Sequence, residues 1–258
     1  MKPWFEADWP APKGVRVLST LREGSGPEGA GGGADAALGV SKAPYARFNL
    51  GDHVGDDPVA VAENRRRLRS AAGLPAEPAW LAQLHGITVA DLDVEGPQGP
   101  ADAAITRRPC KVCAILTADC LPIVFATETG DTVAAAHAGW RGLAAGVIGA
   151  TVRAMEVSPE RLIIWLGPAI GPAHFEVGQD VREAFLKADS GAGEAFQPNA
   201  RGRFMADLVK LARRQLVSLG VTRIYGGGEC TYSQSGRYFS HRRDGVTGRQ
   251  ATLIWREA

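Results

Sequence analysis

The sequence predicts an α/β protein in which one mixed β-sheet, or two such sheets, is covered by helices. Apolar, β-branched runs typical of strands alternate with amphipathic stretches typical of helices through most of the chain. Several strand-like runs follow one another directly, which favours a mixed sheet over a purely parallel, doubly wound one. The 258 residues have an ordinary globular composition and contain no linker-like stretch, so we predict a single domain spanning residues 1–258.

The N-terminal part of the chain is predicted to contain a strand, a flexible loop and a helix. Residues 15–21 are rich in residues that favour strands. Residues 24–39 are mostly glycine and alanine, which offer little side chain for packing, so a flexible loop is predicted there. After a turn-rich segment, the pattern predicts an amphipathic helix from Val59 to Ala72 that ends at Gly73.

The middle of the chain is predicted to supply several buried strands. Two strand-like segments flank Gly86, and residues 111–127 are almost continuously apolar, as in strands buried on both faces. Pro122 interrupts this run just after Cys120. A short apolar strand then leads through a glycine-rich turn into a helix predicted from Leu143 to Met155.

The C-terminal part alternates again between strands and helices and includes a long polar loop. The predicted elements are strands at residues 161–167, 221–228 and 250–255, helices at Gln179–Ala188 and residues 205–220, and a loop at residues 229–249.

Charge and composition narrow the class of partner. The formal net charge is +1, so no overall field attracts the chain to nucleic acid or to an anionic membrane, which favours small-molecule partners. The N-terminus lacks the apolar core of a signal peptide, and no apolar stretch reaches the roughly 20 residues of a membrane helix, so a cytoplasmic location is predicted. The unevenly spaced cysteines favour reduced thiols or thiolate ligands over disulfides.

Three predicted strand ends carry residues that are typical metal ligands. His85 and His137 each lie beside glycine, and Cys120 lies between them at a comparable break. They are too far apart in sequence for a local zinc finger, but a fold that joins three strand ends brings them together. Two imidazoles and one thiolate suit zinc, and three protein ligands leave a fourth position open, as in catalytic sites. The glycines let a substrate approach the ligands closely.

These residues also have an ordinary structural interpretation. A buried cysteine on an apolar strand is usually a small core residue, and a histidine at a strand end is often only a hydrogen-bonding group. Cys110 and Cys113 form a CxxC pair, but no second pair accompanies it, so we interpret it as structural.

Two further segments suit anion binding. The turn AGWRG after His137 opens a helix whose first N–H groups lack internal partners, and Arg141 lies beside it. The loop SHRRDGVTGR carries Arg242, Arg243 and Arg249 and is interleaved with aromatic residues, which favours recognition of a phosphate or carboxylate. The alternatives are a close helix-to-strand fit for the glycines and a solvated face for the arginines.

Taken together, the motifs resemble the multicopper polyphenol oxidase family, also called the laccase-domain family, whose members have been reassigned as purine nucleoside phosphorylases. The resemblance runs in the family's order over nearly the whole chain, and HAGWRG with TADCLP is its most specific part. The matching stretches are SKAPYARFNLGDHVGDD, NRRRL, QLHG, TADCLPIVF, HAGWRGL, GPAIGPAHFEVG and CTYSQSGRYFSHRRDGVTGRQATLIW.

The resemblance implies a site, a fold and a reaction. It implies that His85, Cys120 and His137 are zinc ligands, and that two mixed sheets are layered between helices. The implied reaction is phosphorolysis of adenosine, inosine and methylthioadenosine to free base and ribose 1-phosphate, with adenosine deamination as a companion activity. Bacterial relatives are also linked to editing of peptidoglycan precursors. The glycine-rich segment looks like an insertion beside the loop that leads to Arg47 and Asn49, and His174 lies at a variable position to which no role is assigned.

The two implied reactions need different binding and catalytic groups. Phosphorolysis needs an anion clamp, for which Arg47, Arg141 and Arg249 are the candidates, with Asn49 as a further substrate-binding residue. Deamination suits zinc but also needs a proton-shuttling group, and Asp119 is the nearest candidate. In an undisturbed strand, Asp119 and its neighbour would point to opposite faces, so a structural carboxylate is the alternative.

Three other functions fit parts of the sequence. Two histidines and one cysteine are also the ligand set of a blue-copper site, which would suit an oxidase. A multicopper oxidase also needs a trinuclear copper cluster, and this cluster takes many more imidazoles than His53, His174 and His241 provide. We therefore expect at most adventitious copper. A hydrolase would instead use Cys120 with a histidine as a metal-free nucleophile. A binding protein would hold a nucleoside without turnover. The predicted partners are a purine nucleoside and phosphate, and the chain is expected to be a monomer or a small homo-oligomer.

Overall fold

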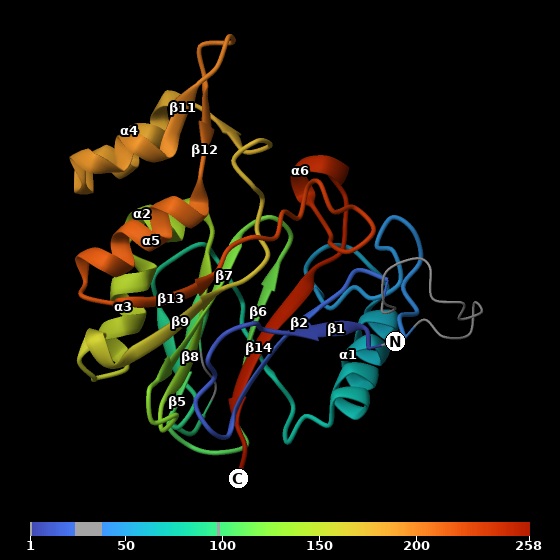
Figure 1. Cartoon of the computed structure of the whole chain (residues 1–258). Coiled ribbons are helices and arrows are strands. Elements are labelled where there is room, and N and C mark those ends of the chain that lie inside the picture. Colours follow the sequence, from blue (N-terminus) through green and yellow to red (C-terminus); the bar gives the residue numbers. More distant parts are fainter. Residues whose placement is uncertain (1, 24–37, 97–98) are drawn as a thin grey trace.

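Two mixed β-sheets lie face to face in the computed structural model, which describes residues 2–23, 38–96 and 99–258 (Figure 1). The five-stranded sheet has the order β1 (Trp4–Glu6), β2 (Val15–Thr20), β14 (Gln250–Arg256), β6 (Val112–Thr117) and β3 (Ala79–Trp80). The six-stranded sheet has the order β13 (Arg223–Gly226), β9 (Leu162–Leu166), β7 (Leu121–Thr127), β8 (Val133–Ala138), β5 (Ala103–Thr106) and β4 (Val89–Asp91).

Both sheets are mixed, as predicted. Most neighbouring strands run antiparallel, while β3 is parallel to β6, β4 to β5, and β13 to β9. A third, antiparallel sheet was not predicted. It contains β10 (Glu176–Val177), β12 (Phe204–Ala206) and β11 (Phe196–Pro198), and it stands beside α4 at the top of Figure 1.

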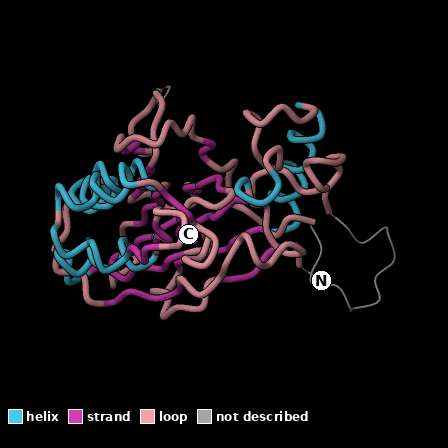
Figure 2. The backbone as a smooth tube through the Cα atoms, turned by 90° about the horizontal axis from the view of Figure 1, so that it is seen from above, coloured by secondary structure: helices cyan, strands magenta, loops and turns pink. Residues whose placement is uncertain are grey.

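Helices cover the outer faces of the two large sheets, and Figure 2 shows them at opposite sides of the strands. Helix α1 packs on the five-stranded sheet, where Leu68 joins a buried cluster with Leu253. On the six-stranded sheet, α2 to α5 contribute to a larger cluster. The helices are α1 (Pro58–Ala72), α2 (Trp140–Ala145), α3 (Val147–Ala154), α4 (Gln179–Ala188), α5 (Leu208–Ser218) and α6 (His241–Asp244).

The continuous apolar run of β7 and β8 follows from burial on both faces. In β8, Val133 and Ala135 pack between the two sheets, whereas Ala134 and Ala136 face the helices. Successive side chains of a strand point to opposite faces, so a strand covered on both sides is apolar throughout. Two sheets layered between helices, as the resemblance implied, are therefore confirmed.

Local sequence signals set the ends of α1. Asp57 caps the helix by accepting a hydrogen bond from the backbone N–H of Val59, and Pro58 occupies the first helical position. Gly73 ends the helix in the left-handed conformation, with φ of 61°. The helix predicted from Val59 to Ala72 is thus confirmed, beginning one residue earlier.

Three predicted boundaries are wrong or untested. The single helix predicted from Leu143 to Met155 is two helices that begin at Trp140 and break at Gly146, whose φ is 99°. The helix predicted at residues 205–220 begins only at Leu208, because the preceding residues form β12. The flexible loop predicted at residues 24–39 lies outside the described residues except at its last two positions.

No helix in the described part of the chain is long and apolar enough to span a membrane.

Candidate metal centre

The three predicted ligands meet at one end of the six-stranded sheet. Cys120 directly precedes β7, and His137 is the penultimate residue of β8. These strands are antiparallel neighbours that pair Leu121 with Ala138, which places Cys120 and His137 at the same end. His85 reaches this point from the segment between β3 and β4. The prediction that three distant segments converge is therefore confirmed in the geometry.

The ligand atoms are close enough to share one ion. One nitrogen of each histidine and the cysteine sulfur all lie within 4.8 Å of one another. The Sγ of Cys120 is 3.8 Å from Nε2 of His85, and the two imidazole rings have centroids 4.7 Å apart. His137 is 3% exposed, whereas His85 is exposed, so the cluster is closed on one side and open on the other.

Asp102 bonds the imidazole of His137 and the backbone of His85, a role that sequence reasoning missed. Its carboxylate accepts a hydrogen bond from Nδ1 of His137 at 2.9 Å, so Nε2 is the nitrogen left for a metal. The same carboxylate accepts the backbone N–H groups of Leu84, His85 and Gly86 at 3.1, 2.8 and 2.6 Å. These bonds hold His85 in a left-handed conformation with φ of 60°, which is uncommon for a non-glycine residue.

Asp102 carried one weak signal in the sequence. It is an isolated acidic residue immediately before the apolar strand β5, and it is almost fully buried. A buried carboxylate requires hydrogen-bonding partners, but its partner lies on β8 and is identified only by the strand register.

The charged groups of this cluster stabilise the ionised forms of their neighbours. Burial raises the pKa of the Cys120 thiol, but the charge and hydrogen bonds of His137 and His85 lower it more, to about 6. Burial lowers the pKa of His137, but the Cys120 thiolate and Asp102 raise it to about 9. Burial also raises the pKa of Asp102, yet the hydrogen bonds from His137 and the backbone lower it to about 2. The sulfur is therefore held as a thiolate, which is the form that binds metal.

The donor set fits zinc. Two imidazole nitrogens and one thiolate sulfur are ligand types that zinc prefers, and an oriented imidazole bonded to a carboxylate is the usual arrangement around such ions. Among the described residues, this is the one group of three such side chains that could hold a metal ion. Three ligands with an exposed side leave room for a further ligand, as in catalytic zinc sites.

Gly139 makes the approach of the ligands possible. A Cβ on this residue would lie 2.8 Å from Sγ of Cys120 and 2.8 Å from Cδ2 of His85. Such distances require atoms to move, and the backbone at this residue is the N-cap of α2. The glycine after the histidine therefore makes room for the ligands themselves, in addition to the substrate access predicted from the sequence.

We expect Gly139→Ala to weaken zinc binding by roughly 10-fold or more, because the added methyl pushes Cys120 and His85 apart and ligand geometry controls affinity. The measurement is a competition titration against a chelator of known affinity. Gly149→Ala, in the neighbouring helix α3, is the matched control and should bind zinc normally. Equal affinity in both variants would show that Gly139 does not set the ligand spacing.

Arg249 is the predicted anion-binding residue next to the strand end that leads to Cys120, because its neighbour Gln250 pairs with Thr117 at the end of β6. Burial lowers its pKa, while the charges of Cys120 and Asp119 raise it. Its Nη1 donates to the carbonyls of Thr247 and Gly248. Its Nε and Nη2 make no hydrogen bond with the part of the chain that the structure describes, so they are available to an anion.

Asn49 has a structural role that supports Arg249. Its amide nitrogen donates to Gly51 and Asp56, and its amide oxygen accepts the backbone N–H groups of Gly51 and Arg249. The side chain is fully buried and fully bonded. Asn64 of α1 in turn donates to the carbonyls of Arg47 and Asn49. Asn49 therefore fixes the backbone of Arg249, and direct contact with a substrate stays a prediction.

The other two predicted anion-binding residues, Arg47 and Arg141, differ in whether their guanidinium groups already have a partner. Arg47 has an unusual φ of 56°, and its half-exposed side chain lies 3.9 Å from Glu23. Arg141 is exposed and stacks on the ring of Trp140 at 4.5 Å. Its guanidinium makes no hydrogen bond or ion pair with the described residues, so it is free to bind an anion. Neither arginine has a described contact with the three ligands.

Asp119 points toward the C-terminal loop, and both its oxygens are occupied. Its carboxylate accepts hydrogen bonds from the Thr231 hydroxyl and the Arg242 backbone N–H, each at 2.7 Å. Its φ is 96°, so the backbone turns sharply just before Cys120. This environment matches the alternative of a structural carboxylate that anchors the loop beside the ligand.

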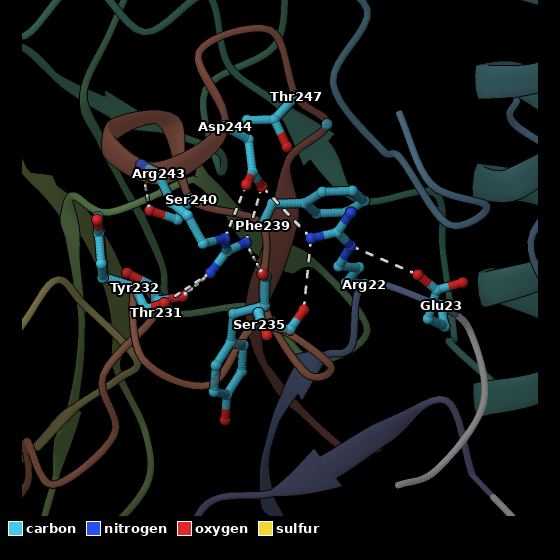
Figure 3. Close-up of polar contacts among 12 residues, drawn as sticks. Arg22, Glu23, Thr231, Tyr232, Ser235, Phe239, Ser240, Arg243, Asp244 and Thr247 are labelled. Carbon is cyan, nitrogen blue, oxygen red and sulfur yellow. Dashed lines mark hydrogen bonds and ion pairs between the residues drawn. The ribbon is translucent and has the colours of Figure 1, made fainter. Parts of the chain in front are cut away.

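Most of the basic loop serves to hold its own backbone. Figure 3 shows Arg22 and Arg243 converging on Asp244, and Arg243 also donates to the carbonyls of Thr231, Tyr232 and Tyr238. Arg242 donates to the carbonyl of Glu176 and lies over the ring of Phe175. Of the three arginines predicted in this loop, Arg249 interacts with the charge of Cys120.

The other histidines and the CxxC pair do not belong to the described three-residue cluster. His53 lies beside Asp52, His174 stacks on Tyr232 with ring centroids 4.2 Å apart, and His241 bonds the carbonyl of Gly245. They form no second cluster of metal ligands within the described ranges. Cys113 is fully buried in β6, where burial raises its pKa, as expected for a core residue.

Comparison with known proteins identifies the family of this chain. The chain matches the family described as multi-copper polyphenol oxidoreductase laccase over residues 34–257. It is 50% identical over 256 residues to a purine nucleoside phosphorylase of Pseudomonas aeruginosa, covering 99% of both chains. It is 48% identical over 248 residues to the purine nucleoside phosphorylase YfiH of Escherichia coli, covering 96% of both.

Solved structures share the same fold. A Neisseria meningitidis protein has a TM-score of 0.90 with 44% identity, and each chain is covered completely. YlmD from Geobacillus stearothermophilus has a TM-score of 0.87 with 30% identity, covering 100% of this chain and 97% of that one. The chain therefore belongs to the multi-copper polyphenol oxidoreductase laccase family, as its motifs predicted.

Proposed function

We propose that this chain is a zinc-dependent purine nucleoside phosphorylase that acts on adenosine, inosine and methylthioadenosine, with adenosine deamination as a side activity. The observation that carries the proposal is the His85, Cys120 and His137 cluster, with the unbonded nitrogens of Arg249 beside it. The names of the relatives from Pseudomonas aeruginosa and Escherichia coli support the reaction class.

The residues divide into ligands, a positioning carboxylate and an anion clamp. His85, Cys120 and His137 would hold the metal, and Asp102 would orient the imidazole of His137 and hold the backbone of His85. When bound, zinc supplies Lewis acidity toward a substrate oxygen or water. Arg249 would bind phosphate, since a guanidinium with two free donors matches a phosphate well. Arg141 and Arg47 are the further candidates for this clamp.

The site suits phosphorolysis because it combines a positive charge with an accessible side. During cleavage of the glycosidic bond, the attacking phosphate is already an anion, and the departing base gains negative charge or takes a proton. Fixed positive groups hold the phosphate and can stabilise the charge that develops on the base. A proton-shuttling role for Asp119 in deamination stays a prediction, and it requires the bonds from Thr231 and Arg242 to open.

We expect Arg249→Gln to raise the KM for phosphate by roughly 10- to 100-fold, because the variant loses a charge-assisted hydrogen bond to the anion. Steady-state kinetics with phosphate as the varied substrate measure this effect. Arg242→Gln, in the same loop, is the matched control and should leave the KM for phosphate unchanged. An unchanged KM in Arg249→Gln would remove this residue from the clamp.

The experiment that tests the proposed function is incubation of metal-analysed protein with adenosine, with and without phosphate, followed by identification of the products. Ribose 1-phosphate and adenine formed only with phosphate would establish phosphorolysis. Inosine formed equally with and without phosphate would leave deamination as the sole reaction. No turnover of adenosine, inosine or methylthioadenosine would refute the proposal.

A second candidate function is a metal-free hydrolase, with peptidoglycan precursors as substrates. The observation that favours it is the thiolate of Cys120 beside two imidazoles, since such a pair is nucleophilic by itself. Metal analysis separates the two candidates. Full activity in protein that contains no stoichiometric metal and resists chelators would favour the hydrolase.

A further inference from the structure

A separate cavity lies between the helices that cover the six-stranded sheet. It is bounded by α2, α3, α4 and α5, and its volume is about 960 Å³. This size is within the usual range of ligand pockets, roughly 300 to 1,000 Å³. Figure 1 shows α4 above α2 and α5, at the side of the molecule away from the C-terminal loop. None of the residues assigned to the metal centre lines the cavity.

The wall of the cavity contains several small apolar residues. Ala144, Ala145 and Gly149 line it from α2 and α3, and Ala188 and Ala192 line it from α4 and the turn after it, with Ala145 and Ala188 exposed. Phe185 and Leu211 add larger apolar surface. On the rim, Val217 is 63% exposed and Leu219 is 36% exposed. Such a wall accepts an aromatic or aliphatic body, because apolar surface gains free energy when it leaves water.

The rim of the cavity carries an excess of positive charge. Arg214 pairs with Asp189, and Lys210 lies 3.6 Å from a carboxylate oxygen of Glu194. Arg213 instead donates to the carbonyls of Ile224 and Gly226 and forms no ion pair with an acidic side chain of the described residues.

Arg153 has no partner for its charge. Its guanidinium makes no hydrogen bond or ion pair with the described residues, and it lies over Gly149, where a Cβ would come within 3.2 Å of Nη1. Two arginines therefore line this cavity without an ion pair to any acidic residue that the structure describes, although the whole chain carries a net charge of only +1. An uncompensated guanidinium at the edge of an apolar pocket suits a carboxylate, sulfonate or phosphate group.

We propose that this cavity is a second binding site that takes one small organic anion, with its apolar body against the alanine and glycine wall and its charged group at Arg153 and Arg213. The two parts of the ligand are both required. A neutral aromatic compound lacks the ionic contact, and a simple inorganic anion lacks the apolar contact.

Fluorescence titration with 1-anilinonaphthalene-8-sulfonate tests this site in the intact chain. We expect one dye bound per chain, with affinity at least tenfold higher than for neutral N-phenyl-1-naphthylamine. Inorganic sulfate should compete only at concentrations that screen charge generally. Arg153→Glu should weaken dye binding roughly 5- to 10-fold through lost attraction and added repulsion, without changing binding of the neutral probe.

Three variants complete the test. Ala145→Trp fills the cavity at an exposed position and should abolish binding of both probes. Lys13→Glu reverses an exposed charge outside the cavity and should bind the dye normally. Cys120→Ala should also bind it normally, because the site is independent of the metal centre and of the proposed reaction. Dye binding that is unchanged in both Arg153→Glu and Ala145→Trp, or equal for the charged and neutral probes, would overturn the proposal.

Discussion

Asp102→Asn is expected to weaken zinc binding by roughly 10- to 100-fold, the usual effect of removing a group that orients metal ligands. The carboxylate accepts three backbone N–H groups and Nδ1 of His137. An amide at this position keeps one acceptor oxygen. It replaces the other oxygen with an NH₂ group, which cannot accept the hydrogen bonds that this oxygen received. His137 would then lose the bond that fixes its tautomer, and His85 would lose the contacts that hold its strained backbone.

The same substitution is expected to destabilise the metal-free protein by about 2 to 4 kcal/mol, because buried donors are left without an acceptor. Competition titration measures the zinc affinity, and urea denaturation of the metal-free protein measures the free energy of unfolding.

Asp93→Asn is the matched control, since Asp93 accepts hydrogen bonds from Thr106 and Arg107 at the opposite end of β5. This variant should lose stability without losing zinc affinity. Zinc binding within twofold of the wild type in Asp102→Asn would contradict the proposed role of the carboxylate.

Cys120→Ala is expected to lower kcat/KM for adenosine phosphorolysis by about 10³-fold or more, because Lewis-acid stabilisation by a metal contributes several kcal/mol. The substitution removes one of three ligand atoms that lie within 4.8 Å of one another. The side chain is only partly buried, so the variant should fold, with a thermal midpoint close to that of the wild type.

Cys110→Ala is the control for this prediction, because Cys110 is another partly buried thiol and lies outside the metal cluster. Its kcat/KM should match the wild type. A Cys120→Ala variant that keeps substantial activity would exclude both the metal mechanism and the nucleophilic-thiol alternative, since both depend on this sulfur.

The layered fold was predictable because local patterns agree with long-range packing. The apolar runs of β7 and β8 require cover on both faces, and α1 has a cap, a proline and a terminal glycine in the expected places. The break at Gly146 was not predictable, because a glycine inside an apolar helical pattern is compatible with a continuous helix. Strand β12 was missed because its residues run directly into the pattern of α5.

The metal centre was only partly predictable, for a physical reason. Residue type and glycine neighbours indicated His85, Cys120 and His137, but convergence depends on the pairing of β7 with β8 and on the path of the His85 loop. Residue spacing alone left the metal and core interpretations open, and the family resemblance selected the metal. Asp102 and Asn49 act through hydrogen bonds to residues distant in sequence, so their roles become visible only in three dimensions.

X-ray absorption at the zinc edge tests the central claim most directly. In protein that carries one zinc per chain, we expect one sulfur scatterer and at least two imidazole nitrogens around the ion, and the sulfur contribution should disappear in Cys120→Ser. A zinc environment without sulfur in the wild-type protein, or full activity in protein that carries no stoichiometric metal, would contradict a catalytic site built from these three side chains.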